Sequence, residues 1–480
     1  MSDPLRVLSV DLGATSVRVA AVDLAMGEPV VEVLHRWEHS PIRVGDGSLR
    51  WDWPRIVSEV ESGLERGLAT GGAASIGVDG WGVDYGLIDR TGELVALPFS
   101  YRDSRTDGWQ ETADRIGPEN LYERTGVQIM GINTIFQLAA HESAELSNAS
   151  RILLLPDLLV HHLTGLEAAE RSNASTTALM DIRTGDWATD LLDDLSLDPS
   201  LFPPVIGAGT TAGKWREIPV HLVGSHDTAS AFLGMPGGSS PGTVFVSAGT
   251  WVLVGVERPG PDTSARARAA NFSNEAGALG GIRFLKNVVG LWILEQCRQA
   301  WGGPPIEMLL DEAASIATEV PTFDAGDHRF VSTADMVREV QEAADLPPST
   351  HRSVIARSVI ESIVTGIGGV VEELEQITDE RPARIAVVGG GARVPLLHDL
   401  LSRRTGLPVV RGSQEATALG NAIVQGVAMG VFGGLDEARD WLGAGDALGG
   451  AVAGDITDGV DAGKVTGGLN VGRQRNGEAE

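Results

Sequence analysis

The feature that most constrains the fold is a pattern of strand, glycine turn and strand that occurs twice. The first copy, RVLSVDLGATSVRVAAV, begins at Arg6, and the second, TVFVSAGTWVLVGV, begins at Thr243. Aligned on Gly13 and Gly249, the two copies share apolar flanks and a threonine close behind the glycine. Two unrelated β-hairpins would also give such a pattern, but the shared turn favours a duplicated architecture in which one copy opens each half.

Strand and helix patterns alternate along the rest of the chain, which predicts an α/β fold. A chain of 480 residues is too long for one core, so two domains are expected. The stretch PGGSSPG at residues 236–242 is the natural boundary and hinge, near Gly237. We therefore predict domains at 1–237 and 238–442, followed by a Gly-rich, weakly ordered tail at 443–480.

The charge of the chain limits its partners. Acidic residues number 65 against 37 basic ones, a formal net charge of −28, which repels nucleic acid and anionic membranes. Any polyanionic ligand must therefore be held locally, by backbone N–H groups, helix ends or a metal ion. A single cysteine, Cys297, excludes an internal disulfide. Without a signal-peptide pattern or a membrane-spanning apolar run, a cytoplasmic protein is expected.

Three glycine turns point to a nucleotide. A glycine hairpin tip such as Gly13 or Gly249 presents backbone N–H groups that bind phosphate without lysine. Asp11 would repel that phosphate unless a divalent cation lies between them, which predicts Mg²⁺, although an aspartate there is often only a turn cap. The turn at Gly389–Gly391 lacks the GxGxxG order, and no GxxxxGK[ST] occurs. It leaves a flat surface for an adenine ring.

Asp227, in GSHDTASAF, lies between a buried strand and the start of a helix. Its ordinary interpretation is a helix N-cap. Phosphoryl transfer to an alcohol, however, needs a base near the hydroxyl and dipolar or cationic stabilisation of the γ-phosphate. Asp227 and the glycine turns would together supply both.

A cluster of aromatic and charged residues between positions 79 and 107 has the composition of a sugar site. A solvated loop with ion pairs would explain part of it. Its members are Trp81, Asp84, Tyr85, Tyr101, Arg102, Asp103 and Arg105, and Asn271, Asn274, Glu275 and Asn287 could contribute from the second half.

Taken together, these motifs resemble those of the FGGY carbohydrate kinases of the actin/hexokinase/Hsp70 superfamily. VDLGATSVRV, IGVDGWGVDYGLID, YRDSRTDG, SHDTASA, VSAGTWVLVGVE, NFSNEAG, VVGGGA and EATALGN occur in the family's order and spacing, from about Val7 to Gly430. The resemblance implies two RNase H-like domains with ATP and sugar in the cleft between them.

The resemblance also implies roles for individual residues, with Asp227 as the proton acceptor. Val17, Gly80, Ala276 and Glu295 depart from the usual pattern. Sugar contacts are implied at Gly82, His226, Asp227, Thr228 and Asn287, and ATP contacts at Ala14, Thr15, Ser16, Val17, Arg18, Thr250, Glu295, Gly389, Gly390 and Gly391.

Within the family, the motifs are most similar to members that phosphorylate L-rhamnulose at O1 with ATP, giving L-rhamnulose 1-phosphate. L-fuculose and L-xylulose remain alternative substrates. A non-catalytic sensor of sugar or nucleotide, or an actin-like assembly protein, would have the same fold, but assembly would leave the cluster at 79–107 unexplained. A monomer and a homodimer are both compatible with this interpretation.

Overall fold

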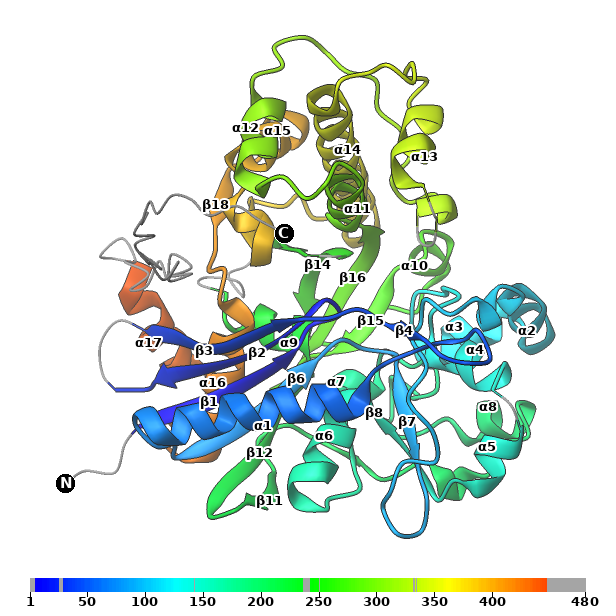
Figure 1. The fold of residues 1–480 in the computed structure, drawn as a ribbon, viewed down its shortest axis with the longest axis vertical. Coiled ribbons are helices and arrows are strands. Elements are labelled where there is room, and N and C mark those ends of the chain that lie inside the picture. The colour runs from blue at the N-terminus through cyan, green and yellow to red at the C-terminus, as the bar shows by residue number, and fades with distance from the viewer. Residues whose placement is uncertain are drawn as a thin grey trace, which may run out of the picture.

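A computed structural model of the chain describes residues 5–25, 29–141, 143–235, 242–249, 251–330, 333 and 335–446. It contains two six-stranded sheets, one in each half of the sequence, with helices on both faces of each (Figure 1). The arrangement is the α/β fold that the repeated turn predicted.

The first sheet follows the order β3–β2–β1–β6–β12–β11. Its first three strands are antiparallel, and β6 and β12 add in parallel. The strands are β1 (Arg6–Leu12), β2 (Ser16–Asp23), β3 (Val30–Glu38), β6 (Ser75–Gly80), β11 (Thr211–Trp215) and β12 (Ile218–His226).

The second sheet repeats this topology. Its order is β15–β16–β14–β13–β17–β18, in which the antiparallel strands β16, β14 and β13 are again followed by the two parallel strands β17 and β18. The sixth strand, β15, pairs antiparallel with β16 and so lies at the opposite edge from β11 of the first sheet. The repeat confirms that the two glycine turns open two copies of one unit. The strands are β13 (Thr243–Ala248), β14 (Trp251–Arg258), β15 (Ser273–Ala276), β16 (Ile282–Val289), β17 (Arg384–Val388) and β18 (Val409–Arg411).

Each sheet packs its outer face against helices of its own half. In the first half α1 (Trp53–Thr70) and α6 (Leu155–Thr164) share a core with β1 and β2. In the second half the helices α11 (Trp292–Ala300), α12 (Ile306–Ala314), α13 (Met336–Ala343), α14 (Arg352–Thr378) and α15 (Pro395–Thr405) cover the sheet. Apolar residues at helical spacing in α14 therefore face the core, as expected.

Shorter elements surround these two layers. The small sheets are β4 (Ile42–Arg43) with β5 (Leu49–Arg50), β7 (Tyr85–Ile88) with β8 (Arg151–Leu154), and β9 (Ala169–Glu170) with β10 (Val205–Ile206). The other helices are α2 (Trp109–Ile116), α3 (Pro118–Thr125), α4 (Thr134–Ala139), α5 (Ser143–Asn148), α7 (Arg171–Ala174), α8 (Thr189–Asp194) and α10 (Ala265–Ala269). The 3₁₀ turns are η1 (Ser104–Thr106), η2 (Pro199–Leu201), η3 (His328–Phe330) and η4 (Gly389–Arg393).

Between the sheets lie two helices, each of which packs on the sheet of the other half. Helix α9 (Asp227–Leu233), which follows the last strand of the first sheet, packs on the second sheet, and α16 (Ala416–Ala428) packs on the first. They cross at Gly234 and Gly420: a Cβ on Gly420 would lie 1.7 Å from the carbonyl oxygen of Ser230. The crossing therefore depends on the absence of a side chain.

The end of the chain returns to the first half. Helix α17 (Leu435–Asp446) buries Trp441 and Leu442 in a core with Val7 and Leu24. It therefore continues past the start of the predicted tail at residue 443, and residues 447–480 lie outside the described part. The predicted hinge at Gly237 also lies outside it. A domain boundary at residue 237 therefore stays a prediction. Helices α16 and α17, which come after that residue in the sequence, pack on the first sheet.

Helix α14 is long and apolar enough to cross a membrane by length and composition alone. In the fold, however, 72% of its most apolar window is buried inside the protein. Ile355, Val359, Ile363 and Ile367 all lie in the core of the second half. This helix is a core helix.

Candidate active site

The glycine turns of the two halves face one another across the cleft. In the first turn, the Gly13 N–H donates to the Ser16 carbonyl at 3.0 Å, and the Gly249 N–H of the second donates to the Trp251 carbonyl at 2.9 Å. Gly389 has a φ of +74°, and a Cβ there would lie 3.1 Å from the Ala248 carbonyl oxygen. All three glycines line one cavity of about 260 Å³, so the fold brings together turns from distant parts of the sequence.

The same cavity is lined by every residue for which the resemblance implied a sugar contact. Gly82 comes from the segment after β6, His226 from the end of β12, Asp227 and Thr228 from the start of α9, and Asn287 from β16. Ala14, Thr15 and Asp11 line the cavity as well. The tertiary structure thus places these sequence-predicted residues around one small space between the halves.

Asp227 does not act as a helix N-cap. It is the first residue of α9, whose cap position is His226, with no capping side-chain bond. Its Oδ1 accepts a hydrogen bond from the Thr228 hydroxyl at 3.0 Å, and 32% of its side chain is exposed. Burial by the cavity walls raises the pKa of Asp227 above its ordinary value, with Asp11 contributing in the same direction. A carboxylate in this position can accept a proton from a bound hydroxyl.

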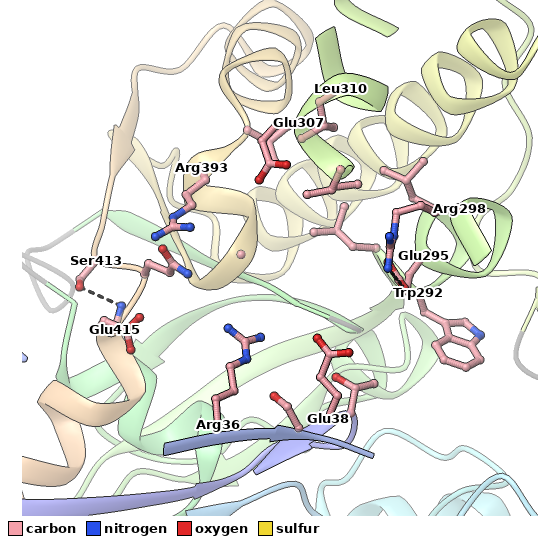
Figure 2. A pocket seen from close by; sticks show the side chains of 18 of the residues that line it. Arg36, Glu38, Trp292, Glu295, Arg298, Glu307, Leu310, Arg393, Ser413 and Glu415 are labelled. Carbon is pink, nitrogen blue, oxygen red and sulfur yellow. Dashed lines mark hydrogen bonds and ion pairs between the residues drawn. The ribbon is translucent and has the colours of Figure 1, made fainter. Parts of the chain in front are cut away.

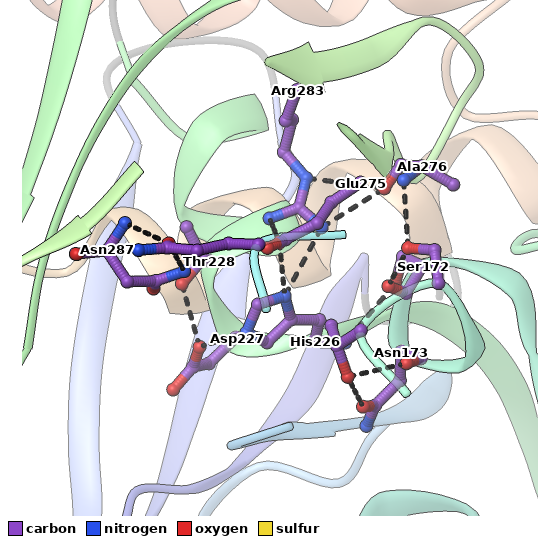
Figure 3. Close-up of polar contacts among 12 residues, drawn as sticks. Ser172, Asn173, His226, Asp227, Thr228, Glu275, Ala276, Arg283 and Asn287 are labelled. Carbon is purple, nitrogen blue, oxygen red and sulfur yellow. Dashed lines mark hydrogen bonds and ion pairs between the residues drawn. The ribbon is translucent and has the colours of Figure 1, made fainter. Parts of the chain in front are cut away.

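Behind Asp227, the buried Arg283 connects the second sheet to this aspartate through His226 (Figure 3). Nη1 of Arg283 lies 3.2 Å from Oε2 of Glu275, and its Nη2 lies 3.2 Å from Nδ1 of His226. His226 Nε2 is in turn 3.6 Å from Asp227 Oδ1. Burial raises the pKa of Glu275, but Arg283 and His226 outweigh that effect and keep the pKa below its ordinary value. Glu275 therefore stays ionised, and the pair fixes the imidazole beside Asp227.

Sequence reasoning missed Arg283, although a signal for it was present. Glu275 and Arg283 are directly opposite each other in the antiparallel pair β15–β16, on either side of the turn GALGG. Directly opposed residues of an antiparallel pair point to the same face. A glutamate and an arginine flanking a glycine turn are thus a cross-strand ion pair that the sequence could have revealed.

Gln128 is a second residue that sequence reasoning missed. Its Oε1 accepts hydrogen bonds from the backbone N–H of Asn287 at 2.7 Å and from the Asn287 amide at 3.0 Å. Because these bonds join positions 159 residues apart, nothing in the local sequence indicated them. Gln128 fixes Asn287 at the wall of the cavity.

Three carboxylates lie around the first glycine turn, at residues 13–16, which is the phosphate turn. Arg18 pairs with Asp11 at 2.5 Å and with Glu415 at 2.8 Å. Asp79 is fully buried, accepts a bond from Asn421 at 2.6 Å, and has one oxygen without a hydrogen-bond partner among the described residues. Burial raises the pKa of Asp79 strongly, and the nearby Asp11 and Asp227 add to the effect.

This excess of negative charge suits a hard divalent cation. No group of three or more ligating side chains in the described part of the chain is arranged to hold a metal by itself. A magnesium ion bound through one or two carboxylates, water and substrate phosphates fits these residues. Asp11, beside the turn, is the carboxylate placed for it.

Much of the predicted sugar cluster instead supports the wall of the cavity. Trp81 and Tyr101 line the cavity. Asp84, however, is buried and accepts hydrogen bonds from Trp51 Nε1 at 2.7 Å and Trp81 Nε1 at 3.0 Å. A further three members line no part of it: Tyr85 bonds His141, Asp103 accepts from the Leu49 N–H, and Arg105 bonds Gln137. The interpretation of these four as sugar contacts was wrong, because the polar atoms of Asp84, Tyr85 and Asp103 are already paired within the protein and Arg105 is held by Gln137 away from the cavity.

A larger cavity of about 1570 Å³ opens beside the small one. Thr15, Ser16, Glu295 and Gly390 line it, and Thr15 lines both cavities. Glu295 forms a bidentate pair with Arg298, with both contacts at 2.7 Å (Figure 2). The position, next to two glycine turns, suits a nucleotide whose phosphates reach toward Asp227.

The remaining predicted ATP contacts lie differently. Val17 has its side chain in the core of the first half, and Gly391 is buried against Ala248, so neither lines a cavity. Because the Val17 side chain points into the core, the valine leaves the phosphate turn itself unobstructed. Arg18 reaches the site only through its pairs with Asp11 and Glu415. Thr250 lies outside the described residues.

Both halves of the chain match the domains of one known family. Residues 6–234 match the N-terminal domain and residues 244–429 the C-terminal domain of the FGGY family of carbohydrate kinases. The chain belongs to this family. The match confirms the family, the fold and the kinase chemistry that the motifs implied: the protein is a sugar kinase that uses ATP.

Curated relatives and solved structures agree with the assignment. The chain is 35% identical to a rhamnulokinase of Enterococcus faecalis over 455 residues, 90% of this chain and 91% of the relative. It is also 35% identical to one of Bacteroides thetaiotaomicron over 441 residues, 88% and 90%. A xylulose kinase structure from Lactobacillus acidophilus has a TM-score of 0.74 at 16% identity, covering 91% of this chain and 92% of that one. A Plasmodium falciparum glycerol kinase structure with ADP scores 0.72 at 16% identity and the same coverage. These structures share the actin/hexokinase-like fold.

Proposed function

We propose that this kinase transfers the γ-phosphoryl group of ATP to O1 of L-rhamnulose, giving L-rhamnulose 1-phosphate and ADP in L-rhamnose catabolism in the cytoplasm. The observation that carries the proposal is the 35% identity to curated rhamnulokinases over about nine tenths of the chain. It is supported by an aspartate, Asp227, that faces a cavity small enough to suit a monosaccharide.

The geometry supports a direct transfer. With the ketose in the smaller cavity, Asp227 accepts the proton of O1–H as O1 forms a bond to the γ-phosphorus. The bond from that phosphorus to the bridging oxygen breaks, and ADP leaves with the electron pair. The turns at Gly13 and Gly249 line the cavity beside the phosphates and would present backbone N–H groups other than those of the two glycines, which already donate within the turns. A Mg²⁺ ion near Asp11 would supply the remaining charge neutralisation when bound.

The sugar is held, in this proposal, from both halves. Gly82, His226 and Thr228 contact it from the first half, while Asn287, fixed by Gln128, contacts it from the second. The nucleotide side is formed by Ala14, Thr15, Ser16, Glu295, Gly389 and Gly390. Because both ligands lie between the halves, closure would exclude water as a competing acceptor.

The substrate assignment is tested by measuring ADP release over a panel of ketoses. We expect the highest kcat/KM with L-rhamnulose and lower values with L-fuculose and L-xylulose, because the curated relatives that are 35% identical to this chain are rhamnulokinases. A higher kcat/KM with either alternative would overturn the sugar and leave the chemistry intact. Sugar binding without ADP release from any ketose would instead support the non-catalytic sensor.

The pH dependence follows from the raised pKa of Asp227. The base works only when ionised, so activity is present above its pKa and is lost as the pH falls through it. Since burial raises this pKa, we expect the acid limb of kcat/KM to lie above about 3.9, the value of an ordinary aspartate. Circular dichroism at each pH controls for unfolding. An acid limb at or below the ordinary value, with the fold intact, would contradict this assignment.

A further inference from the structure

The phosphate turn of this kinase has no free cationic side chain. Arg18, its only basic residue, already pairs with Asp11 and Glu415. Asp79 and Asp227 add further carboxyl groups close by. In a chain with a net charge of −28, a polyphosphate at this position meets repulsion that one Mg²⁺ only partly offsets. Other cations must face the nucleotide.

Two arginines on opposite walls of the larger cavity meet this need. Arg36 lies on β3 in the first half, and Arg393 lies in η4, two residues after Gly391, in the second half. Figure 2 shows both guanidinium groups pointing into the cavity. Neither forms an ion pair or a side-chain hydrogen bond with any residue that the structure describes. Arg298, in the same cavity, is by contrast fully engaged with Glu295.

Strand register places Arg36 close to the phosphate turn. Arg36 is directly opposite Arg18 in the antiparallel pair β2–β3, so the two side chains project from the same face of the sheet, one strand spacing of about 4.8 Å apart. Arg18 follows the turn on β2 and pairs with Asp11 and Glu415. Arg36 is therefore positioned one strand further along the path that a polyphosphate would follow out of the turn.

Arg393 approaches the same path from the other half. The backbone of η4 begins with the glycine turn at Gly389, which reaches the smaller cavity, and ends at Arg393 on the wall of the larger one. A guanidinium group binds phosphate oxygens through two parallel N–H bonds, which suits it to this task better than an ammonium group.

We propose that Arg36 and Arg393 form a clamp that holds the polyphosphate of the nucleotide from both halves of the kinase. This inference rests on the proposed function, in which the larger cavity holds ATP. Arg393 binds phosphate in the open enzyme, because it belongs to the nucleotide side of the cleft. Arg36 adds its contact when the halves close over ATP and sugar, so it acts mainly during turnover.

The clamp is tested with Arg36→Gln and Arg393→Gln in the full chain, by calorimetric titration of ADP and of adenosine and by steady-state kinetics with the best ketose. Loss of a charge-assisted bond predicts that Arg393→Gln weakens ADP binding by roughly tenfold or more and leaves adenosine binding unchanged. Arg36→Gln is expected to change ADP binding little but to raise the KM for ATP about tenfold or more. Lysine at either position should restore part of each loss.

Arg403→Gln is the matched control, because Arg403 is exposed on α15, outside both cavities. The clamp is overturned if either glutamine variant binds ADP and uses ATP as the control does, or if adenosine binding falls in parallel with ADP binding. Failure of the wild-type protein to bind ADP at all would count against the proposed nucleotide site itself. The two failures are therefore distinguishable.

Discussion

Replacing Asp227 with alanine is expected to abolish sugar phosphorylation and to leave ADP binding close to that of the wild type. A positioned general base contributes about 10²–10⁴-fold to the rate, and the cavity offers no second carboxylate with the same access to the sugar. Asp79 is fully buried, and Asp11 is paired with Arg18. Glu275, which also lines the cavity, is buried and paired with Arg283. Kinetics of ADP release, together with calorimetric titration of ADP, measure the two effects separately.

Asp227→Asn sharpens this experiment. The amide oxygen can still accept the hydrogen bond from Thr228, which is 3.0 Å from Oδ1 in the wild type, but the amide cannot accept a proton from the sugar. Asparagine should therefore be as inactive as alanine while keeping the local structure. Near-normal turnover in either variant would eliminate Asp227 as the base.

Replacing Gly420 with alanine should produce the largest loss of stability. The added Cβ would lie 1.7 Å from the Ser230 carbonyl oxygen and 2.9 Å from the Gly234 nitrogen. These contacts are with the backbone of α9, so no side-chain rotation can relieve them and the two crossed helices must separate. Overpacking a core costs about 1–3 kcal/mol, and a backbone collision should reach at least the upper part of that range.

Gly369→Ala is the matched control, since Gly369 lies in helix α14 and an added Cβ there meets nothing within 4 Å. Alanine should stabilise that helix by up to about 1 kcal/mol, because glycine costs about this much in a helix interior. Thermal unfolding midpoints would therefore shift in opposite directions for the same chemical change. Equal midpoints for the two variants would show that the crossing tolerates a side chain.

Activity should fall along with stability in the Gly420 variant. Asp227 is the first residue of α9, and Asn421, next to Gly420, donates the hydrogen bond to Asp79. Separating the helices thus moves Asp227 and one of the neighbouring carboxyl groups at the same time. The crossing links the position of the proposed base to the packing of both halves.

The sequence alone predicted the duplicated fold and the principal site residues, because these depend on local patterns. Glycine turns between apolar strands identified both copies. The position of Asp227 alone suggested a helix cap, and only the glycine turns and the family resemblance indicated a base. The same reasoning failed for Asp84, Tyr85, Asp103 and Arg105. A list of polar residues does not show which of them find partners inside the protein, and Asp84 is held by two tryptophans.

Contacts between segments far apart in the sequence could not be predicted and were seen only in the tertiary structure. The role of Gln128 and the exchange of α9 and α16 are visible only after folding, since each contact joins residues far apart in the chain. The same holds for Arg36 and Arg393, which look like ordinary surface arginines in the sequence. By itself, then, the sequence determined the repeated turn and the fold, and it predicted the base. Only the tertiary structure decided which charges are paired and which face the cleft, because pairing depends on distances that the linear order of residues does not contain.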